Sequence, residues 1–215
     1  MLRRIASELA EHAPFTAIGA VTGIIIIVII VYGNVSAQIS LTIFYTLHPL
    51  HVLLSALVTT AMYRKYGKGK VWAVILVGYT GSISIATLSD SIIPYVGEIL
   101  LRLPHPESHI GFIEKWWLVN PMALIGIAIG YLRPTTKLPH SGHVLLSTWA
   151  SLFHVAMALG GIMNWLLLPL IFLFLFLAVW IPCCLSDIVF PLLFTGKRLL
   201  PPEHITHNHS HSGGE

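Results

Sequence analysis

The chain has 215 residues, of which 55% are hydrophobic and only 10% are charged, and its mean hydropathy is +0.80. A soluble domain usually carries about 25% charged residues. This composition therefore excludes an ordinary soluble domain and predicts an all-α integral membrane protein whose main partner is the lipid bilayer. The two cysteines, Cys183 and Cys184, are adjacent, which excludes a disulfide framework.

Six apolar segments come close to the roughly 20 residues that a transmembrane helix needs. In chain order they cover residues 15–32, 40–63, 71–93, 116–132, 141–161 and 165–190. A polar loop that contains Glu98 separates the third segment from the fourth, and Pro182 predicts a kink in the last one. We expect residues 1–202 to form a single transmembrane domain, followed by a flexible, His-rich cytoplasmic tail over residues 203–215.

The Lys and Arg residues predict the orientation of these spans. With six spans, every Lys and Arg except Arg102 and Lys115 falls on one side of the membrane. Cytoplasmic loops carry an excess of these residues, so both termini are predicted to be cytoplasmic in a multi-pass protein of the cell (inner or plasma) membrane. The same loops account for the net charge of +3 without a nucleic-acid partner.

Short motifs recur in the same order in the two halves of the chain, over residues 12–98 and 114–200. The recurring pairs are His48-Pro-Leu-His51-Val-Leu-Leu-Ser55 with His140-Ser-Gly-His143-Val-Leu-Leu-Ser147, Leu88-Ser89-Asp90 with Leu185-Ser186-Asp187, and Pro14, Ile18, Gly19 and Gly23 with Pro121, Ile125, Gly126 and Gly130. Each half holds three spans, an odd number, so the second half is predicted to be inverted relative to the first. Inverted repeats with a site near their interface are common in transporters.

Each half carries two histidines and one aspartate, a set that suits metal binding. Histidines at positions i and i+3 project from one face of a helix. Two imidazoles and a carboxylate suit Zn, Fe, Mn, Co or Ni, of which we expect zinc or iron. The sequence predicts two pseudo-symmetric metal sites, an outer one and a cytoplasmic one. Their ligands would be His48, His51 and Asp90 on the outer side, and His140, His143 and Asp187 on the cytoplasmic side.

Other ionisable residues extend this prediction. Ionisable residues within membrane spans are functional candidates by default. We expect Glu11 and His12 near the cytoplasmic site, and His154 and Glu98 near the outer one, although His154 alone is equally well interpreted as a structural core histidine. Short His-rich tracts are typical of metal binding, so the tail is predicted to capture metal through His204, His207, His209 and His211.

The hypothesis that joins these features is a transporter of divalent transition-metal ions that is coupled to protons through its histidines. The layout resembles small six-span cation exporters built from two inverted three-helix halves, in architecture alone. A homodimer is plausible for so small a bundle. Two alternatives remain open. One is an intramembrane metal-dependent hydrolase of lipid or lipid-linked substrates. The other is a b-type haem protein that uses His48 or His51 together with His154.

Overall fold

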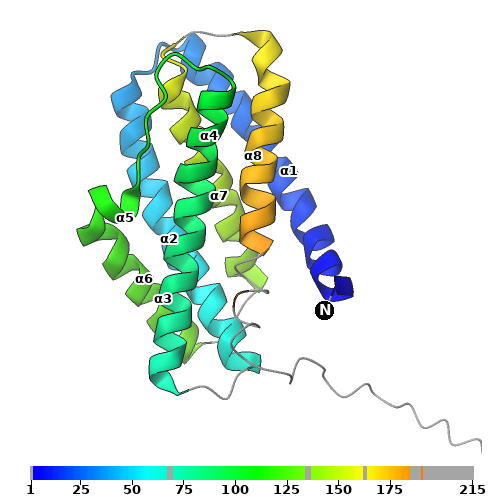
Figure 1. Cartoon of the computed structure of the whole chain (residues 1–215), viewed down its shortest axis with the longest axis vertical. Helices are drawn as coiled ribbons and strands as arrows, with labels where there is room; N and C mark the ends of the chain where they lie inside the picture. The colour runs from blue at the N-terminus through cyan, green and yellow to red at the C-terminus, as the bar shows by residue number, and fades with distance from the viewer. Residues whose placement is uncertain (1, 67–69, 134–136, 162–163, 185–189, 191–215) are drawn as a thin grey trace, which may run out of the picture.

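The chain folds into a bundle of helices that run up and down beside one another (Figure 1). A computed structural model describes residues 2–66, 70–133, 137–161, 164–184 and 190, without the side chains of residues 2–8, 11–12, 66, 137–140 and 184. The elements are α1 (Leu2–Tyr32), α2 (Ala37–Tyr66), α3 (Val71–Thr87), the π-helical turn η1 (Leu88–Ile92), α4 (Ile93–Leu100), α5 (Gly111–Glu114), α6 (Trp116–Leu132), α7 (Lys137–Ala158), the 3₁₀ turn η2 (Trp165–Leu167) and α8 (Leu168–Cys184). No strand occurs among these residues, which confirms the all-α prediction.

Four helical segments are long and apolar enough to cross a membrane. They are Ala13–Tyr32, Ala37–Lys65, Val71–Leu100 and Trp165–Cys183. They match the first, second, third and sixth predicted spans. The fourth predicted span is the shorter apolar helix α6, and its 17 residues reach about 25 Å at 1.5 Å per residue. The fifth is α7, whose described part buries several polar side chains.

The third span extends further than the sequence predicts. Helix continues from α3 through η1 and α4 to Leu100, so Glu98 lies on a helix and not in the predicted loop. Pro94 explains the wide turn between α3 and α4. A proline in a regular α-helix has no N–H for the carbonyl four residues earlier, here that of Asp90, and its ring clashes with that carbonyl. A π-helical turn at Leu88–Ile92 accommodates this defect, and such turns often occur at functional sites.

Helix α2 lies at the centre of the bundle and packs against α3, α6 and α7, whereas α1 packs against α7 and α8. Small residues let α6 lie directly on the backbone of α2. A β-carbon at Gly126 would come within 2.2 Å of the Leu53 carbonyl oxygen, and one at Gly130 within 2.4 Å of the Leu57 carbonyl oxygen. Glycine is the residue that permits such close helix approach.

The two ends of the bundle differ in structure, and several basic residues gather at one of them. The lower end in Figure 1 carries Arg64, Lys65, Lys70 and Arg133, at the ends of α2 and α6 and the start of α3. At the upper end, residues 101–110 leave α4 and run back along the bundle to α5 (Figure 1). Near the same end, α7 stops at Gly160 and Gly161, whose positive φ angles of 56° and 79° favour glycine.

Candidate functional site

Two groups of polar side chains lie inside the bundle, and most of their members are buried. The first, here called the Asp90 cluster, contains His48 and His51 from α2, Ser89 and Asp90 from η1, and Ser147 from α7, all of them fully buried. The second, here called the Glu98 cluster, contains Glu98 from α4, His154 from α7 and His109 from the segment before α5. Buried ionisable groups are costly unless they are hydrogen-bonded, so their partners determine what each cluster can do.

In the Asp90 cluster, hydrogen bonds occupy all the acceptor positions of the Asp90 carboxylate. Asp90 Oδ2 lies 2.9 Å from His48 Nδ1 and 2.7 Å from His51 Nδ1. Asp90 Oδ1 accepts hydrogen bonds from the hydroxyl groups of Ser89 and Ser147, each at 2.7 Å. A carboxylate offers about four acceptor positions, and all of them are used here. The π-helical turn that carries Asp90 is also fixed to α7, since the Ser89 carbonyl accepts a hydrogen bond from the Ser151 hydroxyl at 2.9 Å.

The saturated carboxylate orients both imidazoles. An ionised carboxylate only accepts hydrogen bonds, so the Nδ1 atoms of His48 and His51 carry the protons and their Nε2 atoms keep a lone pair. Both Nε2 atoms are buried and neither has a hydrogen-bond partner. A histidine whose other ring nitrogen donates to a carboxylate is the usual arrangement of a metal-binding imidazole.

The two open Nε2 atoms have different neighbours. The His48 ring stacks on Phe44, with ring centroids 5.4 Å apart, and its edge faces Gly111. A β-carbon at Gly111 would lie 2.5 Å from His48 Cδ2 and 2.7 Å from His48 Nε2. The His51 ring stacks on the ring of His143 from α7, with centroids 5.9 Å apart. The cluster therefore joins α2 to both α7 and the segment that starts α5.

In the Glu98 cluster, both ring nitrogens of His154 have hydrogen-bond partners, whereas one oxygen of the Glu98 carboxyl group has none. His154 Nδ1 lies 2.7 Å from Glu98 Oε1, and His154 Nε2 accepts the backbone N–H of His109 at 3.3 Å. Both nitrogens of this imidazole are therefore engaged, with the proton on Nδ1. Glu98 is only 1% exposed, and its Oε2 atom has no hydrogen-bond partner.

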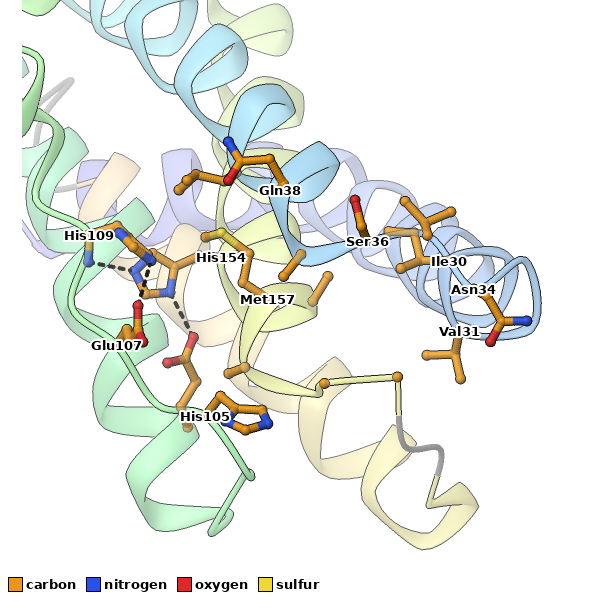
Figure 2. Close-up of a pocket in the computed structure, with 18 residues that line it drawn as sticks. Ile30, Val31, Asn34, Ser36, Gln38, His105, Glu107, His109, His154 and Met157 are labelled. Atoms are coloured by element: carbon orange, nitrogen blue, oxygen red, sulfur yellow. Dashed lines mark hydrogen bonds and ion pairs between the residues drawn. The ribbon is translucent and has the colours of Figure 1, made fainter.

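The Glu98 cluster lies at the wall of a cavity of about 580 Å³ near the upper end of the bundle. Figure 2 shows His154 and His109 meeting at one side of this cavity, with Glu107 and His105 on the same segment of chain. Phe44 lies between the two clusters, because its ring stacks on His48 and meets the ring of His154 edge-on, each at 5.4 Å. A buried apolar side chain thus separates the cavity from the Asp90 cluster.

The structure brings the predicted outer ligands together. His48, His51 and Asp90 meet in the Asp90 cluster. His143, predicted for the cytoplasmic site, lies beside His51 at the edge of this cluster. Glu98 and His154 pair with each other. The side chains of Glu11, His12 and His140, all of Asp187, and the tail residues His204, His207, His209 and His211 lie outside the described part of the chain. Within it, no group of three or more His, Cys, Asp or Glu side chains is placed to hold one metal ion.

Two neighbours of these clusters were not predicted from the sequence. The Ser147 hydroxyl donates a hydrogen bond to Asp90, which lies 57 positions earlier in the chain. The sequence did contain a signal for this residue, because Ser147 is the last residue of the repeated His-x-x-His-Val-Leu-Leu-Ser motif. Phe44 had no such signal, because an aromatic residue in an apolar run is typical of ordinary packing.

The arrangement does not favour the haem alternative in its described form. The Phe44 ring lies between His48 and His154, so these two imidazoles do not face each other. The Nε2 atom of His154 also already accepts the backbone N–H of His109.

Comparison of the chain with models of protein families, with curated proteins and with solved structures gave no match. The geometry of the two clusters therefore carries the functional argument.

Proposed function

We propose that this protein is a membrane transporter of divalent transition-metal ions such as Zn, Fe, Mn, Co or Ni. The observation that supports the proposal is the pair of buried Nε2 atoms on His48 and His51, both oriented by the Asp90 carboxylate and both without a partner. Imidazole nitrogen is a preferred ligand of these ions. Asp90 then acts as the orienting group behind the two ligands and not as a ligand itself.

The free energy of burial supports a ligand-binding role over a purely structural one. A buried polar atom without a partner costs about 1–3 kcal/mol. A purely structural network would be more stable if the Nε2 positions of His48 and His51 were apolar or paired. Burying two open lone pairs next to a saturated carboxylate is the arrangement expected where a cation binds during the working cycle.

We further propose that the ligand set is completed by movement between the two halves of the chain. The described arrangement presents two imidazoles, and the stacked contact places His143 of α7 against His51. A shift of α7 against α2 would change the position of His143 relative to both open Nε2 atoms. Alternating exposure of a site at the interface of two repeats is the transport mode of inverted-repeat proteins.

Two packing features support the inverted repeat in this proposal. Helices that correspond in the two halves run in opposite directions in Figure 1: α1 up and α6 down, α2 down and α7 up, α3 up and α8 down. The contacts are also exchanged, because α1 packs against α7 and α6 packs against α2. The repeat alignment pairs Gly19 with Gly126 and Thr148 with Ala56. Gly19 lies against Thr148 just as Gly126 lies against Ala56.

This proposal gives the bundle an orientation. The end that carries Arg64, Lys65, Lys70 and Arg133 would face the cytoplasm, together with both termini and the His-rich tail. The cavity beside Glu98 would then open to the outer side. Capture of metal by the tail remains a prediction.

The test is metal flux through the full-length protein reconstituted into lipid vesicles that contain a metal-sensitive dye. We expect flux of Zn²⁺, Mn²⁺ or Co²⁺ in the unmodified protein and its loss in His48→Ala and His51→Ala. The matched control is His105→Ala, because His105 is exposed on the segment between α4 and α5 and lies outside the Asp90 cluster. An absence of flux for all these ions, or normal flux in both α2 variants, would refute the proposal.

A further inference from the structure

We infer that Glu98 is a proton-binding site that exchanges its proton with the outer solution through the cavity beside it. The role of this proton as the coupling ion of transport rests on the proposed function, whereas the binding itself does not. Glu98 is 1% exposed and lines the cavity, and its Oε2 atom is buried without a hydrogen-bond partner. Oε2 is therefore an acceptor that a proton can occupy without displacing an existing bond.

The saturation of His154 favours a proton over a metal ion at this place. A transition metal needs three or four ligands, and no such group exists among the described side chains. His154 has both ring nitrogens engaged, one with Glu98 Oε1 and the other with the His109 amide. A proton needs only one oxygen atom. When it attaches to Oε2, the Oε1 contact with His154 is kept.

The surroundings leave the charge of Glu98 free to change. The titratable groups that face the cavity are His154 on α7 and three residues of the segment between α4 and α5, namely His105, Glu107 and His109. The lining from α1 and α2 contributes only uncharged polar and apolar side chains, such as Asn34 and Gln38. On its other side Glu98 meets apolar residues of α8. No Lys or Arg among the lining residues fixes Glu98 in the ionised form.

A short chain of contacts connects this proton to the proposed metal ligands. His154 Nδ1 donates a hydrogen bond to Glu98, and His154 Nε2 accepts one from the backbone N–H of His109. Two residues further on, Gly111 lies against the edge of His48 that carries its open Nε2. Loss of the negative charge on Glu98 weakens a charge-assisted hydrogen bond to His154. The position of the segment over His48 can therefore respond to the proton.

The first experiment uses no metal. Infrared difference spectra of the full-length protein in lipid vesicles, recorded between acidic and alkaline pH, report the carbonyl stretch of protonated carboxyl groups. We expect a titrating band that disappears in Glu98→Gln and persists in Glu107→Gln. Glu107 is the matched control because it lines the same cavity with a side chain that is 73% exposed. Glutamine keeps an oxygen for His154, and a thermal unfolding curve checks that the fold is retained. A band that persists unchanged in Glu98→Gln would overturn the inference.

The second experiment measures metal flux in the same vesicles with and without an imposed pH gradient. We expect the gradient to stimulate flux in the unmodified protein and in Glu107→Gln, and this stimulation to be lost in Glu98→Gln. If Glu98→Gln instead lowers the amount of Zn²⁺ bound per protein and leaves the infrared band intact, Glu98 is a metal ligand and the inference is wrong. A titrating band without any metal flux would refute the proposed function and leave the proton site standing.

Discussion

The Asp90 cluster and the Glu98 cluster each pair a carboxyl group with histidine, but hydrogen bonds occupy opposite partners in the two clusters. Asp90 accepts four hydrogen bonds and leaves the Nε2 atoms of His48 and His51 open. Glu98 gives one oxygen to a fully engaged His154 and leaves its own Oε2 open. The open atom is nitrogen in one cluster and oxygen in the other, although both are carboxyl–imidazole groups in one bundle.

The residue list of a buried polar cluster therefore does not determine its chemistry. Open imidazole nitrogens suit borderline-soft cations, whereas a single open carboxyl oxygen suits a proton. Substitutions in and beside the two clusters test this contrast through the free energy of unfolding and, for most variants, through metal flux or metal affinity.

Phe44→Ala should have the largest effect, because Phe44 is fully buried and separates the two clusters. Truncation of a buried phenylalanine costs about 3–5 kcal/mol of unfolding free energy. We also expect metal flux that no longer depends on a pH gradient, because water in the new space would connect the two clusters. Phe44→Leu is the control, since it keeps most of the volume. Denaturant unfolding in detergent and flux in vesicles measure the two effects, and equal stability of both variants would contradict the prediction.

Asp90→Asn should cost about 3 kcal/mol, because an amide group cannot accept from all four donors and the bonds to a charged acceptor are lost. Glu98→Gln should cost less than about 1 kcal/mol, because the amide oxygen still accepts from His154. Metal affinity should fall about 10- to 100-fold in Asp90→Asn, as for other groups that orient metal-binding histidines. Unfolding curves and Zn²⁺ titration measure these effects. Similar destabilisation by the two amide substitutions would contradict the contrast between the clusters.

Gly111→Ala should cost about 2 kcal/mol, as other overpacked sites do, because the new methyl group would lie 2.5 Å from His48 Cδ2. The contact tilts the His48 ring away from Asp90, so metal flux should fall as well. Gly142→Ala is the matched control, since its methyl group would meet only the flexible tip of Leu54 at 3.2 Å. Thermal unfolding and flux distinguish the two variants, and full activity in Gly111→Ala would show that the segment does not control His48.

Ser147→Ala should cost about 1 kcal/mol, because it removes one of the four donors to Asp90 and leaves the other three. The matched control is Ser40→Ala, because Ser40 is also buried but its hydroxyl has no hydrogen-bond partner. We expect Ser40→Ala to be neutral or slightly stabilising in denaturant unfolding. A larger loss in Ser40→Ala than in Ser147→Ala would mean that the hydroxyl groups near Asp90 do not stabilise the cluster.

Composition and the length of the apolar runs were enough to predict that this chain is helical and apolar enough to cross a membrane several times, because they set those properties directly. The repeated His-x-x-His motif and the Leu-Ser-Asp element also pointed to His48, His51 and Asp90 as one set. Helix geometry explains this success, since residues three apart share one face.

Helix packing, and not the sequence pattern, determines which atoms of these residues have no hydrogen-bond partner. It placed Glu98 on a helix against His154 instead of in a loop, and His143 beside His51. It also brought Ser147 to Asp90 across 57 positions of the chain. Hydrogen-bond saturation depends on contacts between helices that are distant in sequence, and a shift of about 0.5 Å can make or break one such contact. The pattern of residues therefore shows where ionisable groups are buried, and helix packing decides whether each group presents a nitrogen or an oxygen.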